Sequence, residues 1–183
     1  MVGLIITLVV VLILVIFMIT TYNKLIRSKN RLKNAFAQVE THLQRRFDLI
    51  PNLVETVKGY QIHEKELLEN VASCRSGFLH STSNQEKIEL YNDLSSNLKK
   101  LFAITEAYPD LKANAGFLML QQELSATEDK LVYARQFYND AVTLYNDSLL
   151  TFPNNIIGAI LGFKAEALFK SVDEAKSAPQ VRF

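Results

Sequence analysis

The chain has 183 residues, of which 49% are hydrophobic and 21% charged, with 20 Lys and Arg side chains against 19 Asp and Glu. This composition excludes a disordered chain and a fibrous repeat, and the near-neutral charge gives no sign of a nucleic-acid partner. A single cysteine cannot form an intramolecular disulfide or a structural zinc site. Only six glycines and four prolines interrupt the chain, which favours an all-α fold of long helices.

Residues 1–21 contain no charged side chain and form the predicted transmembrane anchor. Twenty helical residues rise about 30 Å, which is the thickness of the hydrocarbon core, so the segment is long enough to span a bilayer. A cleaved signal peptide would need a basic stretch before the apolar run and a small-residue cleavage motif after it, and neither is present. We therefore expect a retained transmembrane helix.

A basic stretch follows the anchor, and the first acidic residue after it is Glu40. Its charged side chains are Lys24, Arg27, Lys29, Arg31 and Lys33. The positive-inside rule predicts a single-pass protein with its N-terminus outside and residues from 22 onward in the cytoplasm. The five side chains are also candidates for membrane-surface contact, because each basic residue near anionic headgroups contributes about 1 kcal/mol. A topology signal without lipid contact explains them equally well.

Apolar residues recur at helical spacing in four further stretches. The predicted helices are 25–47, 48–78, 88–102 and 111–150, with connections at 80–85 and 108–110. Asp48 is expected to cap the second of them, with Pro51 in its first turn; the alternative is that Pro51 kinks a single long helix. Four amphipathic helices with short connections predict a long antiparallel four-helix bundle over residues 22–151.

Residues 152–170 are predicted to form an apolar, membrane-proximal C-terminal helix, because an even number of helix crossings returns the chain to the bilayer face. The apolar part of this segment is too short to span a membrane. Gly158 and Gly162 form a G-x-x-x-G pair, which permits close helix approach. The helix is expected either to close the bundle or to make an interfacial or oligomer contact. Residues 171–183 are expected to be a flexible tail.

No constellation of catalytic or metal-binding residues emerges from the sequence. None of the three histidines has a carboxylate three residues before it, as a di-iron bundle would need. His63 and Glu64 begin like a zinc-protease motif, but the second histidine is absent. Cys74 lies on an apolar stripe, where a buried thiol is expected. We therefore predict no enzymatic activity, no catalytic residue, no cofactor and no metal.

The tripeptide Tyr-Asn-Asp occurs at residues 91–93, 138–140 and 145–147. Tyr138 and Tyr145 are seven residues apart, which is nearly two turns, so they share one helix face. One interpretation places the tyrosines at the edge of the core. The other makes them a stripe that docks a partner helix.

Charged and polar side chains also crowd the predicted turn around Pro51. They include Arg45, Arg46, Asp48, Asn52 and Glu55. One interpretation is a set of internal ion pairs that ties the break together. The other is a membrane-distal surface that contacts another copy or a partner.

Several blocks of this sequence closely resemble the LemA family of bacterial membrane proteins. The first is LQRRFDLIPNLVETVKGY at 43–60, followed by His63, Glu64 and Lys65; later blocks are EAYPDLKAN at 106–114, Ala-Arg at 134–135, Tyr-Asn at 138–139 and 145–146, Phe-Pro at 152–153 and Gly-Phe at 162–163. Phe36 and Phe47 depart from the family's usual Trp and Tyr but keep an aromatic ring. The resemblance implies an anchor in the bacterial inner membrane, a helical bundle inside the cell and no established enzymatic activity.

Two functional hypotheses follow. The first is a non-enzymatic single-pass membrane protein that self-associates as a structural or membrane-organising scaffold, with the lipid bilayer and further copies of itself as partners. The second is a membrane-tethered adaptor or signalling partner for another membrane protein, such as a protease. Neither involves nucleic acid.

Overall fold

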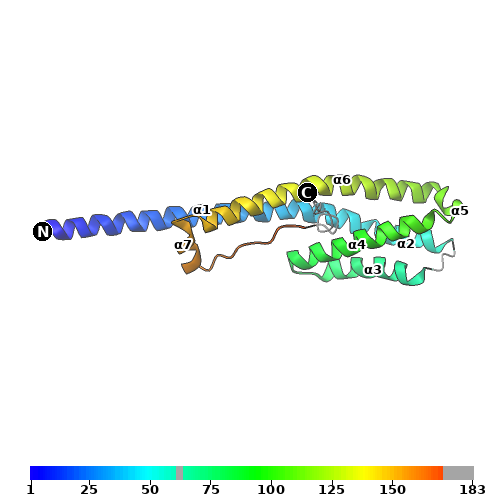
Figure 1. The fold of residues 1–183 in the computed structure, drawn as a ribbon, viewed down its shortest axis with the longest axis horizontal. Helices are drawn as coiled ribbons and strands as arrows, with labels where there is room; N and C mark the ends of the chain where they lie inside the picture. Colours follow the sequence, from blue (N-terminus) through cyan, green and yellow to red (C-terminus); the bar gives the residue numbers. More distant parts are fainter. Residues whose placement is uncertain (61–63, 171–183) are drawn as a thin grey trace, which may run out of the picture. The chain divides into compact units, whose positions relative to one another are not determined.

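The structure is a computed structural model that describes residues 1–60 and 64–170. Within these residues the regular secondary structure is α-helical and no strand occurs, which confirms the all-α prediction (Figure 1). The helices are α1 (Val2–Asp48), α2 (Ile50–Lys58), α3 (Lys65–His80), α4 (Asn84–Thr105), α5 (Pro109–Lys112), α6 (Ala115–Leu150) and α7 (Asn154–Ile160). The predicted flexible tail, 171–183, lies outside the described residues.

The chain divides into two compact units. Unit 1 contains Met1–Ala37 and Gln136–Leu168, and unit 2 contains Gln38–Arg135 together with the chain from Phe169 onward. Helices α1 and α6 each contribute residues to both units.

None of the described residues packs around the apolar part of α1, in unit 1. Residues 1–20 are all exposed, and the most apolar 18-residue window of this helix has a mean hydropathy of 3.5 with none of its residues buried. The hydroxyls of Thr7 and Thr20 donate to the carbonyls of Gly3 and Phe17 in the same helix, at 3.0 and 2.9 Å. This segment is long and apolar enough to cross a membrane, and its backbone and hydroxyl groups find their hydrogen-bond partners within the helix, as the interior of a bilayer requires.

The core of unit 1 begins where this apolar segment ends. Leu25, Leu32 and Phe36 of α1 are buried at helical spacing, as the sequence predicts. The ring of Phe36 meets the ring of Tyr138, on α6, edge to face with 5.3 Å between centroids. This core positions α6 and the segment that follows it against the basic stretch of α1.

In unit 2 the chain does not reverse direction at Pro51. Only Leu49 separates α1 from α2, and its backbone keeps helical angles of φ −78° and ψ −21°. The predicted cap is therefore wrong: Asp48 lies in the last turn of α1 and accepts a hydrogen bond from Gln44 Nε2 at 2.9 Å. Pro51 stands in the first turn of α2, where a missing N–H costs little, so a one-residue interruption accommodates it.

The reversal falls instead between α2 and α3, so the helix predicted over 48–78 is in fact two. Helix α3 packs against α2 and against α4, and α3 and α4 lie side by side with a short connection between them (Figure 1). The rings of Phe47 and Phe78 stack within this core at 4.3 Å. A single-turn helix, α5, precedes α6, which ends at Leu150 as predicted.

Candidate functional site

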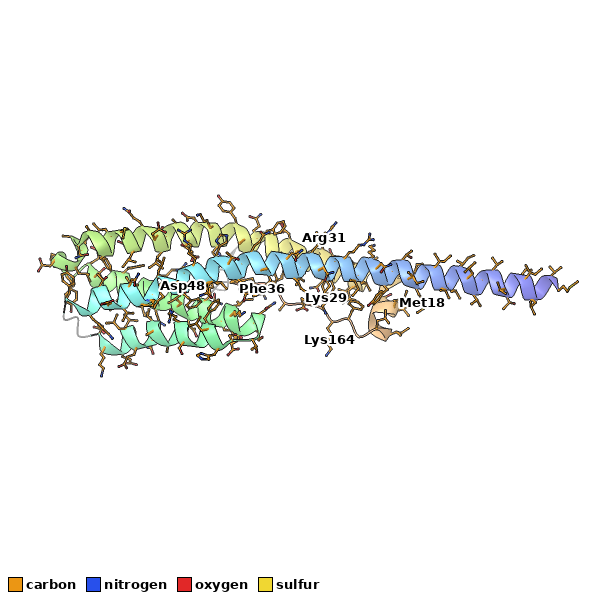
Figure 2. The ribbon with its side chains drawn as sticks, turned by 180° about the vertical axis from the view of Figure 1, so that it is seen from behind. Met18, Lys29, Arg31, Phe36, Asp48 and Lys164 are labelled. Carbon is orange, nitrogen blue, oxygen red and sulfur yellow. The ribbon has the colours of Figure 1, made fainter. Side chains whose placement is uncertain are left out.

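The basic stretch of α1 divides between two faces of the helix. Lys24, Arg27 and Arg31 are spaced three and four residues apart and share one face, whereas the helical period places Lys29 and Lys33 roughly opposite. Figure 2 shows Arg31 and Lys29 on opposite sides of α1. Lys29 is half-buried, with its Nζ 5.8 Å from the centre of the Phe163 ring. The other four side chains are exposed.

Helix α7 packs tightly within unit 1 through Gly158. A Cβ at this position would lie 2.5 Å from Leu149 Cδ1 and 3.8 Å from Leu25 Cδ1. Gly158 is itself buried, so the face that the sequence offered for an oligomer contact is occupied by the chain's own side chains. The close approach serves the packing of α7 on α1 and α6.

Gly162 has a different role, because it ends the helix. Its φ of +74° is in the left-handed region that favours glycine. The N–H of Phe163 donates to the carbonyl of Gly158 at 2.9 Å, and the N–H of Gly162 donates to Ala159 at 3.3 Å, which is a Schellman motif. This turn makes α7 shorter than the helix predicted over 152–170 and directs Phe163 toward α1, where its ring lies 6.2 Å from that of Tyr22.

The outer surface of α7 and the turn before it is apolar. The exposed side chains are Leu150, Phe152, Ile156, Ile160 and Leu161. They lie beside the part of α1 where the apolar segment gives way to the basic stretch, since α7 contacts Leu25 and the following turn contacts Tyr22. Apolar patches of this kind mark a membrane or protein contact.

Tyr138 and Tyr145 are buried in unit 1, with exposed fractions of 2% and 0%. The Tyr145 hydroxyl donates to the carbonyl of Lys164 at 2.9 Å, and the Tyr138 hydroxyl donates to that of Ala167 at 3.3 Å. This arrangement matches the interpretation of tyrosines at the core rather than an exposed docking stripe. Burial raises the pKa of both phenols, and the nearby Glu166 carboxylate acts in the same direction.

Asn146, which belongs to the Tyr-Asn-Asp repeat but was not among the predicted site residues, completes this arrangement. Its Nδ2 donates to the carbonyl of Glu166 at 2.9 Å, and its Oδ1 accepts from the N–H of Glu166 at 3.0 Å. Residues 163–168 have no regular secondary structure, so these side chains supply partners that a helix or sheet would otherwise provide. We refer to residues 163–168 as the strap.

The remaining Tyr-Asn-Asp copy, at 91–93 in unit 2, contacts the two residues that follow the strap in a similar way. Asn92 Nδ2 donates to the carbonyl of Lys170 at 3.2 Å. The ring of Tyr91 meets the ring of Phe169 edge to face at 5.5 Å. Every copy of the repeat therefore contacts the segment that follows α7, and this explains the repeated Tyr-Asn pair.

Arg46 is buried in unit 2, where it forms an ion pair with Glu128 of α6. The Tyr91 hydroxyl donates to Glu128 Oε1 at 2.6 Å, and the guanidinium carbons of Arg46 and Arg135 lie 5.5 and 5.8 Å from the centre of the Tyr91 ring. Burial lowers the pKa of Arg46; Tyr91 opposes this effect and Arg135 adds to it. Arg46 thus has the internal partner that one interpretation expected, although on a distant helix.

The remaining candidates around Pro51 face solvent. Arg45 pairs with Glu123 at 2.8 Å, and both side chains are about half exposed. Asp48, Asn52 and Glu55 are exposed at spacings of four and three residues, so they form one face across the junction of α1 and α2. This face remains accessible to a partner.

The model of the LemA family matches residues 35–183. The chain belongs to the LemA family. It is 27% identical to Protein LemA of Metamycoplasma hominis over 150 residues, which cover 81% of this chain and 68% of that protein. Magnetosome proteins MamQ 1 and MamQ 2 of Paramagnetospirillum magneticum are each 23% identical over 175 residues, covering 81% of this chain and 64% of theirs. The chain thus spans about two thirds of the length of these relatives.

The match to the LemA family confirms the resemblance seen in the sequence. Together with the exposed apolar segment of α1, it identifies a membrane-associated helical protein. The family match includes α6, α7 and the strap as well as the shorter helices of unit 2.

Within the described residues of this LemA-family chain, no group of three His, Cys, Asp or Glu side chains could hold a metal ion. His63, whose motif the sequence raised, lies outside those residues. Cys74 is buried as predicted, and burial raises the pKa of its thiol, with the Asp93 carboxylate acting in the same direction. A protonated, buried thiol is a packing group rather than a nucleophile.

Proposed function

We propose that this LemA-family chain is a non-enzymatic, single-pass protein of the bacterial inner membrane. In this proposal its N-terminus lies outside, and residues 22–151 form a long antiparallel four-helix bundle in the cytoplasm. The observation that supports it best is the fully exposed apolar segment of α1, followed at once by five basic residues. The positive-inside rule supplies the orientation.

The proposed role is that of a self-associating, membrane-organising scaffold. In unit 1, α6 exposes Phe137 and Leu144, which are seven residues apart and share one face. In unit 2, α6 exposes Met119 and Tyr133, which are fourteen residues apart. Exposed apolar residues at heptad spacing suit contact along a second helix. The MamQ relatives are named as magnetosome proteins. An organising role for this chain is proposed by analogy with them.

The mass of full-length protein in lipid nanodiscs tests self-association. We expect a discrete oligomer, and a monomer at micromolar concentration would contradict the proposal. The double variant Phe137→Ser with Leu144→Ser should shift the oligomer toward monomer. Gln136→Ser with Thr143→Ser is the matched control, because these exposed residues have the same spacing on an adjacent face of α6. Equal masses for the two double variants would show that this face is not the contact.

A membrane-tethered adaptor for another membrane protein is the second candidate. The exposed face formed by Asp48, Asn52 and Glu55 favours it, since no described residue of unit 2 covers this charged surface. Crosslinking from position 52 in cells should then capture a protein other than the chain itself, and the adduct should be lost in the Asp48→Ala, Glu55→Ala variant. Capture of the chain's own copies alone would count against an adaptor.

A further inference from the structure

Unit 1 contains a groove of about 580 Å³ between α1 and α6. Three cations of one α1 face line it, namely Lys24, Arg27 and Arg31. Thr20 lies at the end nearest the apolar segment, and Leu144 and Ser148 come from α6. The groove therefore combines positive charge, hydroxyl groups and one apolar side chain.

The three cations have no counter-charge among the residues that the structure describes. Within residues 1–60 and 64–170, no carboxylate lies within ion-pair distance of them. Their spacing also places like charges three and four residues apart on one helix face, which destabilises a helix. An anion bound from outside the chain would remove this repulsion.

The position of the groove along α1 indicates where that anion comes from. Lys24 and Arg27 lie about 6 and 11 Å beyond Thr20 along the helix axis. The headgroup layer on each side of the hydrocarbon core is about 5 to 8 Å thick. Side chains of an α-helix lean toward its N-terminus, which here is the membrane side, so Arg27 and Arg31 reach back toward the headgroups.

We propose that this groove binds the phosphate of an anionic phospholipid headgroup. The Arg27 guanidinium presents the planar fork that suits phosphate oxygens, and Lys24 adds a point charge at the depth of the headgroups. Arg31 closes the outer end of the groove. This proposal rests on the membrane anchoring proposed above and assigns the lipid contact to one face of α1 instead of the whole basic stretch.

Lys29 and Lys33 provide a matched control. They belong to the same stretch and carry the same charge, but they lie on the opposite face of α1, outside the groove. The variant Arg27→Gln with Arg31→Gln and the variant Lys29→Gln with Lys33→Gln each remove two positive charges. A non-specific collar of charge would respond equally to both changes.

The test measures lipids retained by full-length protein in mild detergent, by native mass spectrometry, during titration with phosphatidylglycerol or phosphatidylcholine. We expect wild-type protein to prefer phosphatidylglycerol. We expect the Arg27, Arg31 variant to lose about tenfold or more in affinity for it, while the Lys29, Lys33 variant stays within about threefold of wild type. Circular dichroism melting curves confirm that both variants are folded.

Equal losses of phosphatidylglycerol affinity in the two variants, or equal retention of the two lipids by wild-type protein, would overturn the proposal that the groove binds an anionic lipid. Displacement of phosphatidylglycerol by an equimolar amount of inorganic phosphate would identify a site for free phosphate and would also overturn it. Reconstitution separates this inference from the proposed function. If the protein inserts into nanodiscs but the two double variants bind phosphatidylglycerol equally, only the lipid site in the groove is refuted. If the protein does not insert at all, the proposed membrane anchoring is refuted as well.

Discussion

The two units of the chain solve one problem, the burial of polar groups, in two ways. Unit 1 uses neutral side chains: Tyr138, Tyr145 and Asn146 hydrogen-bond to the backbone of the strap. Unit 2 buries a charge, Arg46, and pairs it with Glu128. Neutral hydrogen bonds each contribute modestly, whereas a buried charge that loses its partner is strongly destabilising. The stability of unit 2 should therefore depend on single side chains, and that of unit 1 should be spread over several bonds.

Glu128→Gln should give the largest effect. The glutamine keeps an oxygen for the Tyr91 hydroxyl but leaves the buried Arg46 without a counter-charge. The free energy of unfolding should fall by about 3 kcal/mol, at the lower end for a broken buried pair, because Glu128 retains about a third of its exposure. Urea unfolding of full-length protein in detergent, followed by circular dichroism, measures it. A loss below about 1 kcal/mol would show that Arg46 finds another partner or water.

Asn146→Ala should lower stability by about 1 to 3 kcal/mol, because it removes both hydrogen bonds to the Glu166 backbone. The same denaturation experiment measures the change. Asn34→Ala is the control, since it makes the same substitution at an exposed position of α1 in the same unit. If the two variants unfold alike, the strap contributes nothing to the stability of unit 1.

Tyr145→Phe should cost about 1 kcal/mol at neutral pH, the contribution of one hydrogen bond to Lys164. Its pH dependence is more informative. The folded-state pKa of Tyr145 is raised by burial, so the stability that the protonated phenol contributes is present below pH 10 and is lost as pH rises through the folded pKa. Wild-type protein should lose stability above about pH 10 more steeply than Tyr145→Phe, and parallel curves would contradict burial of the phenol.

Glu123→Gln should have the smallest effect, about 0.5 kcal/mol or less, because the Arg45–Glu123 pair is half exposed and screened by salt. It is comparable with Glu128→Gln because both glutamates lie on α6 and pair with adjacent arginines of α1, one pair exposed and the other buried. Measurement of both variants at low and high salt sharpens the contrast. A cost for Glu123→Gln equal to that for Glu128→Gln would refute the distinction between exposed and buried pairs.

Much of the helical content could be predicted from periodicity alone. The apolar segment of α1, the buried stripe through Leu25 and Phe36, and the end of α6 at Leu150 follow from residue spacing. At Pro51 the sequence left open a reversal or a kink in one long helix, and the structure has no reversal there. A proline breaks a helix only where its missing N–H or its ring conflicts with the preceding turn. At the first turn of α2 neither conflict arises.

The Arg46–Glu128 pair and the hydrogen bonds to the strap were harder to predict, because they join residues that are distant in sequence. Nothing near Arg46 marks Glu128 as its partner, and the strap was predicted as helix, so Asn146 had no visible role. The repeated Tyr-Asn pair was the one available signal. Seven-residue spacing correctly placed the tyrosines on one face, but spacing does not reveal that this face bonds to backbone.

The strap is held through its main chain, and this sets what can change within it. Tyr138, Tyr145 and Asn146 bond to peptide groups of Lys164, Glu166 and Ala167. The side chains of Lys164 and Ala167 are exposed, and Figure 2 shows that of Lys164 pointing away from the helices. Any residue other than proline at position 166 offers the same peptide group. Mutational drift at 164–167 should therefore cost little stability, whereas the three residues that hold the strap and the packed ring of Phe163 have little freedom to change, so an exposed ribbon can diversify without loosening its attachment.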